Sequence, residues 1–334
     1  MSHNPRLLIR QLSESNKRYY SNADLDAIFI PFKARSAYVN DILAELQWYK
    51  GPLYLMPSDD SDMEFIQHHA SQKVQELKVV DNDYKIFYCN LMTSKHNHTS
   101  RYDSAWDLPE KRNYALLHAR TKGYKRILLI DDDIRRLSEQ IVFSGSHMLD
   151  DYKVTGCFVE DFPDTSIFGH LEIAAGGKVN TFLSGSFLFI RPFDVQSFFP
   201  YIYNEDWLFM LPCIIERSIC SFGSIKQVPY DPFANIEKMA FQEFGEIIAE
   251  GLYRLLELNR YGERHSQKTW KDVIRDRRDT LCSLEQSLRH VEYQNVLGAI
   301  RQANTSIDAD ACVKFVTDWE ADTKNWNLYV QEMT

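Results

Sequence analysis

Three consecutive aspartates, Asp131 to Asp133, come directly after the apolar run Ile127 to Ile130. Such a run is typical of a buried strand, and like charges at its end repel one another unless a positive charge lies nearby. Carboxylate oxygens suit Mg²⁺ or Mn²⁺, and open α/β sheets bind ligands beyond the carboxyl ends of their strands. The pattern therefore predicts a divalent-cation site for a phosphate-bearing substrate. A solvated acidic turn, or the N-cap of a helix that begins near Ile134, is the alternative.

A second acidic pair, Glu205 and Asp206, follows Asn204 and precedes an apolar stretch. A carboxylate within hydrogen-bond reach of a hydroxyl group can take its proton, and general-base catalysis of this kind accelerates a reaction about 10²–10⁴-fold. The pair is therefore a candidate for a catalytic base. The same residues would also suit the first turn of a helix, where acids stabilise the helix dipole behind an Asn204 cap.

The elements that would position these residues alternate between strand and helix through the first part of the chain. Strands are expected over 27–31, 53–56, 85–89 and 126–131, and helices over 37–49, 63–77 and 106–122. Such alternation is typical of a parallel sheet with right-handed crossovers. We therefore expect an α/β fold with a Rossmann-like, mostly parallel central sheet flanked by helices, and a nucleotide-binding half over 23–135.

The second half of the chain mixes short strands with long helical patterns. Strands are expected over 154–159 and 187–190, a short helix that Pro212 interrupts over 205–215, and helices from 236 onward, including 273–303 and 309–326. We expect a polar N-terminal arm over 1–22, one catalytic domain over 23–235 with its acceptor half over 136–235, and a helical C-terminal extension over 236–334.

Composition narrows the classes of protein to consider. The chain has 334 residues and a net charge of −9, which disfavours nonspecific binding to nucleic acid through phosphate neutralisation. Its six cysteines include no Cys-x-x-Cys pair, which indicates reduced thiols instead of a zinc or disulfide framework. No window approaches about 18 consecutive apolar residues, and no apolar signal segment is visible near residue 1. We expect a cytoplasmic protein with no integral membrane segment and no nucleic-acid partner.

Four motifs, in order along about residues 26–230, resemble those of a glycosyltransferase of the GT-A fold, closest to the family 2 type. They are the acidic turn Ser58–Asp62, the helix start Lys111–Ala115, the strand end Ile130–Asp133 and the acidic pair within Asn204–Trp207. The third is similar to the Asp-x-Asp motif of that family, whereas the first lacks the glycine of the family's acidic turn. The resemblance implies a metal-dependent transfer of a sugar from a nucleoside-diphosphate sugar to a hydroxyl acceptor, such as a carbohydrate.

The resemblance also implies roles for individual residues. Asp133 would hold the Mn²⁺ or Mg²⁺ that bridges the diphosphate, and Asp131 would reach either that ion or the ribose hydroxyls of the nucleotide. Arg112 and Asn113 would face the phosphates. Asp206 would activate the acceptor hydroxyl, which gives inversion at the anomeric carbon. Retention stays open, because the base is assigned by resemblance.

Further candidates share an expected contact with the nucleotide, the sugar or the metal. Asp59, Asp60 and Asp132 would contact the nucleotide, the Ser184-Gly185 turn would lie near the donor sugar, Glu205 would act beside Asp206, and His265 would be an extra metal ligand. Each has a plain alternative: a polar turn for the aspartates and for Ser184-Gly185, a solvated basic loop for His265. Arg112 could likewise be a helix residue that pairs with Glu110 or Asp107.

Three other functions remain open at this point. A sugar-nucleotide mutase could also carry an Asp-Asp-Asp run. A nucleotidyltransferase of the same fold would need a glycine-rich loop after its first strand, where this chain has Pro31-Phe32-Lys33-Ala34-Arg35. The third is a non-catalytic GT-A module that binds a partner or a glycan. The nucleobase, sugar, acceptor and oligomeric state are not readable from the sequence.

Overall fold

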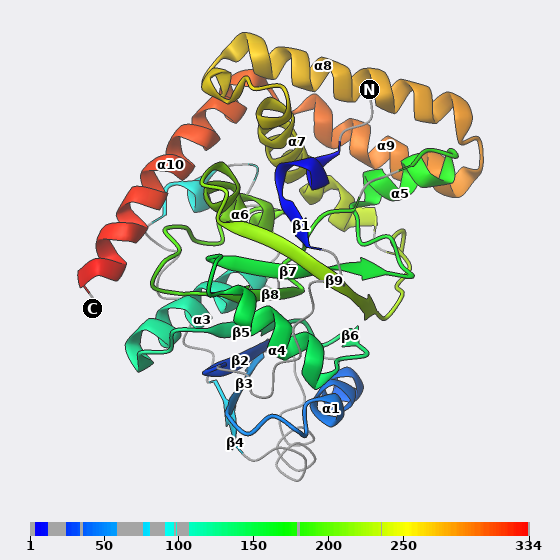
Figure 1. Cartoon of the computed structure of the whole chain (residues 1–334). Helices are drawn as coiled ribbons and strands as arrows, with labels where there is room; N and C mark the ends of the chain where they lie inside the picture. The colour runs from blue at the N-terminus through cyan, green and yellow to red at the C-terminus, as the bar shows by residue number, and fades with distance from the viewer. Residues whose placement is uncertain are drawn as a thin grey trace.

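The computed structural model describes residues 4–12, 25–33, 36–58, 76–80, 91–96, 98, 107–178, 181–234 and 236–332. The expected strand over 85–89, residues 63–75 of the expected helix over 63–77, and the acidic-turn residues Asp59 and Asp60 lie outside this set. The last two residues of that expected helix, 76 and 77, begin a strand instead, because they pair with the neighbouring strand of the sheet. The described part has a mixed α/β fold, with a mostly parallel sheet flanked by helices (Figure 1). This confirms the predicted fold class.

One sheet of nine strands runs through the described residues in the order β1-β9-β7-β8-β5-β2-β3-β4, with β6 paired to β9. Their bounds are β1 Arg10–Leu12, β2 Ala27–Phe32, β3 Pro52–Pro57, β4 Glu76–Val79, β5 Ile127–Ile130, β6 Ile134–Arg135, β7 Val154–Glu160, β8 Phe187–Ile190 and β9 Ile219–Gln227. Strand β8 is antiparallel to β5 and β7, β6 is antiparallel to β9, and the other pairs are parallel.

The central strands β2, β5 and β8 are buried along their whole length, as strands covered on both faces must be. Alternate residues of β2 and β5 face two different apolar cores. Phe29 and Leu129 lie in the core that includes α3 (Leu108–Lys122), whereas Ile28 and Leu128 lie in the core that includes α1 (Ser36–Glu45) and α4 (Glu139–Met148). The expected helix over 106–122 is confirmed, and its C-cap Gly123 has the left-handed conformation (φ 74°).

The remaining helices are α5 Ile167–Ala174, α6 Glu205–Ile215, α7 Ile236–Glu257, α8 Gln267–Ser287, α9 Val291–Thr305 and α10 Ala309–Glu332, with short 3₁₀ turns η1 Pro5–Leu8, η5 Thr93–Lys95 and η6 Tyr261–Glu263. Helix α6 continues through Pro212, so the expected interruption is absent from this described helix. The expected run over 273–303 forms two helices, because the chain leaves helical geometry at Leu288, whose ψ is 82°.

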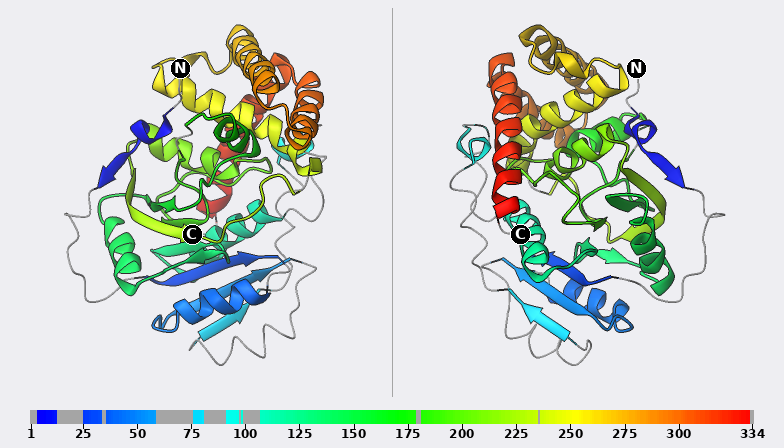
Figure 2. Two further views of the ribbon diagram at one scale, coloured as in Figure 1. Left: turned by 90° about the vertical axis from the view of Figure 1, so that its right-hand side faces the viewer. Right: turned by 60° about the vertical axis from the view of Figure 1, so that its left-hand side comes forward.

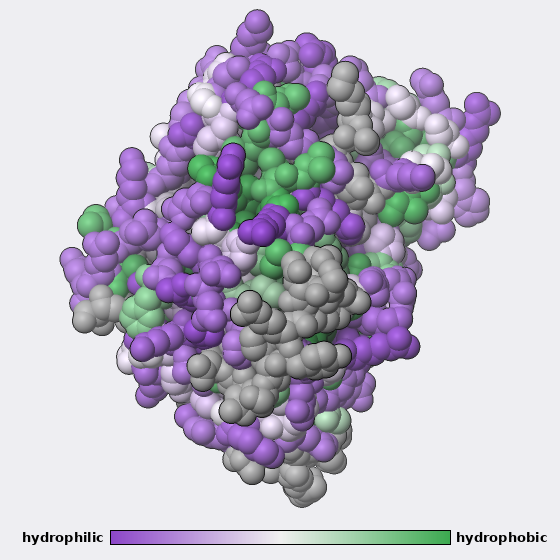
Figure 3. All heavy atoms as spheres, viewed as in Figure 1, coloured by the Kyte–Doolittle hydropathy of each residue, from purple (hydrophilic) through white to green (hydrophobic). Residues whose placement is uncertain are grey.

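The C-terminal helices are joined firmly to the sheet domain. Helices α7, α8 and α9 gather at one end of the molecule, and α10 runs back along its side (Figures 1 and 2). On α10, the Asp322 carboxylate accepts hydrogen bonds from the backbone N–H groups of Met92 (2.9 Å) and Thr93 (2.8 Å), and Trp326 is buried against Phe198. The face seen in Figure 3 is largely hydrophilic. Among the described residues, no helix is long and apolar enough to cross a bilayer.

Strand β1 is an addition that the sequence pattern did not indicate. It lies in the expected polar arm and pairs in parallel with β9, with Arg10 opposite Cys220. The Arg6 guanidinium fixes this segment, because it donates to the carbonyl oxygen of Thr181 (2.6 Å) and lies over the Phe158 ring (4.1 Å). The partner of this short, partly exposed strand lies far along the sequence, so its residue pattern carried no strand signal.

Candidate active site

The strand order changes direction between β2 and β5. From β2 the chain proceeds outward to β3 and β4, and it then returns to β5 on the other side of β2. Ligands bind to such sheets beyond the carboxyl ends of the strands, at the point where the order reverses. Asp131 stands at this point, directly after β5, and its backbone N–H donates to the carbonyl oxygen of Ser186 (2.9 Å). The turn after β5 and the segment before β8 therefore form one edge.

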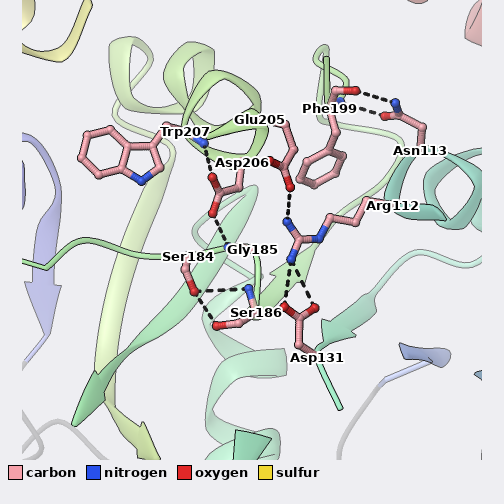
Figure 4. Close-up of polar contacts among 10 residues, drawn as sticks. All are labelled: Arg112, Asn113, Asp131, Ser184, Gly185, Ser186, Phe199, Glu205, Asp206 and Trp207. Carbon is pink, nitrogen blue, oxygen red and sulfur yellow. Dashed lines mark hydrogen bonds and ion pairs between the residues drawn. The ribbon is translucent and has the colours of Figure 1, made fainter. Parts of the chain in front are cut away.

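Arg112 joins two of the predicted motifs. Its Nη1 donates to Glu205 Oε1 (2.7 Å), and its Nη2 donates to both carboxylate oxygens of Asp131 (3.1 and 3.2 Å), as Figure 4 shows. The guanidinium is 3% exposed. Burial alone would lower the pKa of Arg112, but the carboxylates of Asp131 and Glu205 outweigh it and raise the pKa, so Arg112 is a fixed cation. The alternative pairing with Asp107 is not what the structure shows, because Asp107 pairs with Lys111 (3.0 Å).

Lys111 fastens α3 to the edge of the sheet. Its Nζ donates to the carbonyl oxygen of Phe32 at the end of β2 (2.9 Å) and to Ser58 Oγ after β3 (2.7 Å). Burial lowers the pKa of Lys111, and the neighbouring Asp107 carboxylate opposes this. These contacts fix the N-terminal end of α3 against the ends of β2 and β3, and they thereby fix the position of the neighbouring Arg112.

Glu205 and Asp206 begin α6 and are both buried. Burial raises the pKa of Glu205 to about 8, against the opposing effect of Arg112. Asp206 accepts hydrogen bonds at both oxygens, from the backbone N–H of Gly185 to Oδ2 (2.6 Å) and from that of Trp207 to Oδ1 (2.9 Å). Asn204 has φ 62°, the left-handed region, instead of the extended conformation of an ordinary N-cap. The acidic pair is thus tied into the site and is more than a helix start.

At Gly185 the backbone passes close to the Arg112 guanidinium. A Cβ atom at Gly185 would lie 2.2 Å from Arg112 Nη1, so any side chain there would displace the guanidinium. The turn is held on one side by Asp206, and on the other by the hydroxyl groups of Ser184 and Ser186, which hydrogen-bond to each other. The Ser184-Gly185 turn therefore forms part of the cavity lining beside the Arg112 guanidinium.

The other aspartates after β5 are more deeply buried than Asp131. Asp133 Oδ2 accepts a hydrogen bond from Gln227 Nε2 (3.3 Å) on β9, and the Asp133 carbonyl accepts one from Val228 N (2.9 Å). The carbonyl oxygen of Asp132 accepts from Arg135 Nη1 (2.7 Å). These bonds fix the three aspartates after β5 against β9 and the residue that follows it.

Two predicted site residues make contacts elsewhere. Asn113 exchanges two hydrogen bonds with the backbone of Phe199, at 2.7 and 2.8 Å, and so holds the segment that leads to α6. His265 Nε2 lies 3.3 Å from Glu320 Oε2 on α10, and its side chain is 40% exposed. Neither is among the residues that line the cavity described next, and of the three aspartates after β5 only Asp131 is among them.

A cavity of about 990 Å³ opens beside this cluster. Predicted residues that line it are Arg112, Asp131, Ser184, Gly185, Glu205 and Asp206. Lining residues that sequence reasoning missed include Asp164, Gln227, Tyr230, Glu250, Arg254 and Arg277. Asp164 carried no distinguishing signal because it lies in a polar turn, and Arg254 and Arg277 carried none because they lie on helices that read only as apolar stripes. The segments around Tyr230 and Glu250 stand out in the sequence, and the glycines near Glu250 fit either close helix packing or an acceptor-facing surface. The cavity thus extends from the end of β5 to the C-terminal helices α7 and α8.

Among the residues that the structure describes, no three His, Cys, Asp or Glu side chains form a metal-binding group by themselves. Mg²⁺ characteristically takes one or two protein carboxylates and completes its shell with water and substrate phosphates. The acidic turn that carries Asp131 and Asp133, fixed between β5 and β9, fits an ion of this kind that a diphosphate helps to hold.

We compared the chain with known proteins, and the similar solved structures include sugar transferases. No protein-family model matches the chain, and no curated protein sequence matches it significantly. The chain is similar to the mannosyltransferase PcManGT from Pyrobaculum calidifontis in complex with GDP-mannose and Mn²⁺, with 11% identity, a TM-score of 0.46, and coverage of 96% of this chain and 89% of that one.

Two eukaryotic structures are also similar to part of the chain. For mouse xyloside xylosyltransferase 1 the identity is 11%, the TM-score 0.35, and the coverage 58% of this chain and 83% of that one. For core-mannan synthase A from Aspergillus fumigatus in its Mn/GDP form the identity is 11%, the TM-score 0.30, and the coverage 55% and 68%.

Proposed function

We propose that this protein is a metal-dependent glycosyltransferase of the GT-A fold that moves a sugar from a nucleoside-diphosphate sugar to a hydroxyl acceptor. One observation carries the proposal: Arg112, Asp131 and Glu205, from three separate motifs, meet within hydrogen-bond distance at the point where the strand order reverses. A structural ion pair alone would not need to lie at the ligand-binding edge of the sheet or to line a large cavity.

The charges of the site suit a diphosphate leaving group. When bound by Asp131 and Asp133, a divalent cation supplies Lewis-acid stabilisation of the negative charge on the departing diphosphate. Arg112, held by Glu205 and Asp131, places a fixed positive charge in the cavity lining, where it can offset the charge of a diphosphate. Gly185 has no side chain that would displace this guanidinium.

The size of the cavity suits two substrates. Small-molecule sites commonly enclose about 300–1,000 Å³, so the cavity of about 990 Å³ lies at the upper end of that range. One end is lined by Asp131, directly after β5, and the other by Arg254 and Asp276 on α7 and α8. A separate acceptor therefore has room beside the donor, which favours transfer over a mutase that rearranges a single sugar nucleotide.

An acceptor hydroxyl is a poor nucleophile and needs a base. The resemblance assigns this role to Asp206, with Glu205 beside it, and direct displacement by an activated hydroxyl would invert the anomeric carbon. Both the base and the stereochemical outcome stay predictions. His265 has no part in this proposal, because its imidazole pairs with Glu320 away from the cavity lining.

The experiment is a donor panel. The purified chain is incubated with UDP-glucose, UDP-N-acetylglucosamine, GDP-mannose and dTDP-glucose, each with Mn²⁺ and a mixture of sugar acceptors, and released nucleoside diphosphate is measured. Release from one nucleotide class that Asp133→Asn abolishes and Asp161→Asn leaves intact supports the proposal. Asp161 is a matched control, since its exposed carboxylate pairs with Lys226 outside the cavity. Release that is insensitive to Asp133→Asn, or no release from any donor, contradicts it.

A further inference from the structure

Asp164 is a carboxylate in the cavity to which no motif assigns a role. It belongs to the segment Asp161–Ser166 between β7 and α5, and it lines the cavity with Asp131, Ser184 and Asp206. Two contacts fix this segment: the Ser166 hydroxyl accepts from Gly169 N (3.0 Å) as the N-cap of α5, and the Ser184 hydroxyl hydrogen-bonds to the Asp164 carboxylate. Asp164 therefore reaches the same turn that Asp206 holds from α6.

Asp206 has a different task in this arrangement. Each of its oxygens accepts a backbone N–H, from Gly185 and from Trp207, so the carboxylate clamps the turn before β8 to the start of α6. Burial raises the pKa of Asp206, and Arg112 and the two backbone hydrogen bonds oppose the rise. Both oxygens already hold a backbone N–H, so a proton placed on either one would displace a donor and release the turn. A carboxylate with both oxygens engaged in this way is poorly suited to take up a proton in each catalytic cycle.

The surroundings of Asp164 favour proton uptake. Burial is the main cause that raises the pKa of Asp164 to about 7; the Ser184 hydrogen bond opposes the rise, and the negative charge of Asp206 adds to it. Tyr230, which follows β9, also faces this carboxylate, and burial together with Asp164 raises the tyrosine pKa. A base whose pKa lies near the working pH combines a populated carboxylate with a strong tendency to accept a proton.

We propose that Asp164 is the general base for the acceptor hydroxyl, an inference that rests on the proposed glycosyltransferase function. The acceptor O–H proton passes to an Asp164 carboxylate oxygen as the acceptor oxygen bonds to the anomeric carbon. The bond from that carbon to the diphosphate oxygen breaks, and its electron pair leaves with the nucleoside diphosphate. The proton then returns to solvent, which restores the carboxylate. Asp206, by this account, is a positioning residue that holds Gly185 beside Arg112.

The test compares Asp164→Asn with Asp206→Asn and with the control Asp161→Asn, which changes an exposed carboxylate three positions earlier in the same loop. For each, kcat and the donor KM come from nucleoside-diphosphate release with the active donor of the panel. Binding of the matching nucleoside diphosphate with Mn²⁺ is measured by calorimetry, and Tm by calorimetric melting. We expect Asp164→Asn to lower kcat about 10²–10⁴-fold while the donor KM, nucleotide affinity and Tm stay within about twofold or a few degrees of the wild type.

Two further results sharpen the assignment. Formate added to Asp164→Gly should restore part of kcat, because a small carboxylate can enter the space left by the side chain and take the proton. Asp206→Asn should lower Tm and nucleotide affinity together, since an amide nitrogen would then face a backbone donor. Asp161→Asn should match the wild type, since exposed ion pairs contribute about 0–1 kcal/mol.

The inference is overturned if Asp164→Asn retains wild-type kcat, or if its loss of kcat comes with an equal loss of nucleotide binding. It is also overturned if Asp206→Asn alone lowers kcat at unchanged Tm, which would make Asp206 the base. Failure of the wild type to release nucleoside diphosphate from any donor would instead reject the proposed function itself. The two failures are therefore distinct.

Discussion

Arg112 and Glu205 are 93 positions apart in the sequence, and their side chains meet at 2.7 Å in a buried ion pair. The pair joins the N-terminal part of α3 to the first turn of α6, and through Asp131 it reaches the end of β5. Three elements that are distant in sequence thus share one cation. The relationship explains why Arg112 is rigid and why acids from two motifs can lie close together.

Removing the Arg112 guanidinium should destabilise the site and abolish donor binding. Arg112→Ala leaves two buried carboxylates without their cation, and breaking a buried pair in this way costs about 3–5 kcal/mol. Arg112→Lys keeps the charge but cannot bridge Glu205 and Asp131 with a planar fork, so we expect an intermediate loss. Melting curves and nucleotide titration check both variants.

The control for this prediction is Arg301→Ala on α9, which removes an exposed arginine that pairs with Glu285. Its Tm should stay close to that of the wild type, because exposed pairs contribute about 0–1 kcal/mol. Equal losses for Arg112→Ala and Arg301→Ala would contradict the central position of Arg112.

The approach of Gly185 to Arg112 predicts a strong effect from a single methyl group. In Gly185→Ala the new Cβ would lie 2.2 Å from Arg112 Nη1, so either the turn or the guanidinium must move. We expect nucleotide affinity to fall at least about tenfold, which corresponds to about 1.4 kcal/mol. Calorimetric titration measures the loss.

Gly298→Ala on α9 is the matched control, because nothing lies within 4 Å of the added Cβ. Alanine is favoured over glycine inside a helix by about 1 kcal/mol, so this variant should raise Tm and leave nucleotide affinity unchanged. An unaltered affinity in Gly185→Ala would show that Arg112 does not depend on the close turn.

The sequence predicted the parts of this site that depend on local patterns, and it did not predict contacts between residues that are far apart along the chain. The end of β5 and the start of α3 follow from local patterns, an apolar run before aspartates and a helix that closes at Gly123, and both are where the sequence placed them. The pairing of Arg112 with Glu205 depends on the crossing of distant elements, which periodicity does not encode. Asp164 was missed for the same reason, since a polar turn looks alike whether it faces solvent or a cavity.

His265 shows the converse case. Its loop is polar and basic, as a metal-binding loop can be, but the packing of α10 brings Glu320 within 3.3 Å of its imidazole. The sequence pattern also did not indicate strands β1 and β9. Strand β1 has only three residues, and β9, its partner in the sheet, lies about two hundred positions away. Helices α7 to α10 were predictable as helical, since their apolar stripes recur at helical spacing.

A buried charge cluster between the C-terminal helices predicts a pH-dependent stability. Arg277 on α8 donates to Glu243 (2.7 Å) and to Glu246, both on α7, and lies over the Phe168 ring of α5 (3.3 Å). Burial raises the pKa of Glu246 from 4.5 to about 8, and Arg277 opposes the rise. The folded state therefore binds more protons than the unfolded state between these values, so the stability due to this group is complete below pH 4.5 and is lost as the pH rises to about 8.

Glu246→Gln removes this titration, so the free energy of unfolding of the variant should fall less between pH 5 and pH 8 than that of the wild type. Urea unfolding at about five pH values across that range measures both free energies. Glu216→Gln is the control, since the exposed Glu216 carboxylate pairs with Lys153 at the surface. Identical pH profiles for Glu246→Gln and the wild type would show that Glu246 is ionised throughout.

The central claim is a nucleotide site built on a metal held by Asp131 and Asp133, and its most direct test is calorimetric titration of the wild type with UDP, GDP, CDP and dTDP. Each is titrated with Mn²⁺ and again with EDTA, and the series is repeated with Asp133→Asn and the control Asp161→Asn. The account predicts that one nucleoside diphosphate binds with Mn²⁺, that EDTA or Asp133→Asn removes the binding, and that Asp161→Asn preserves it. Binding of no nucleotide under either condition, or binding that EDTA does not change, would contradict it.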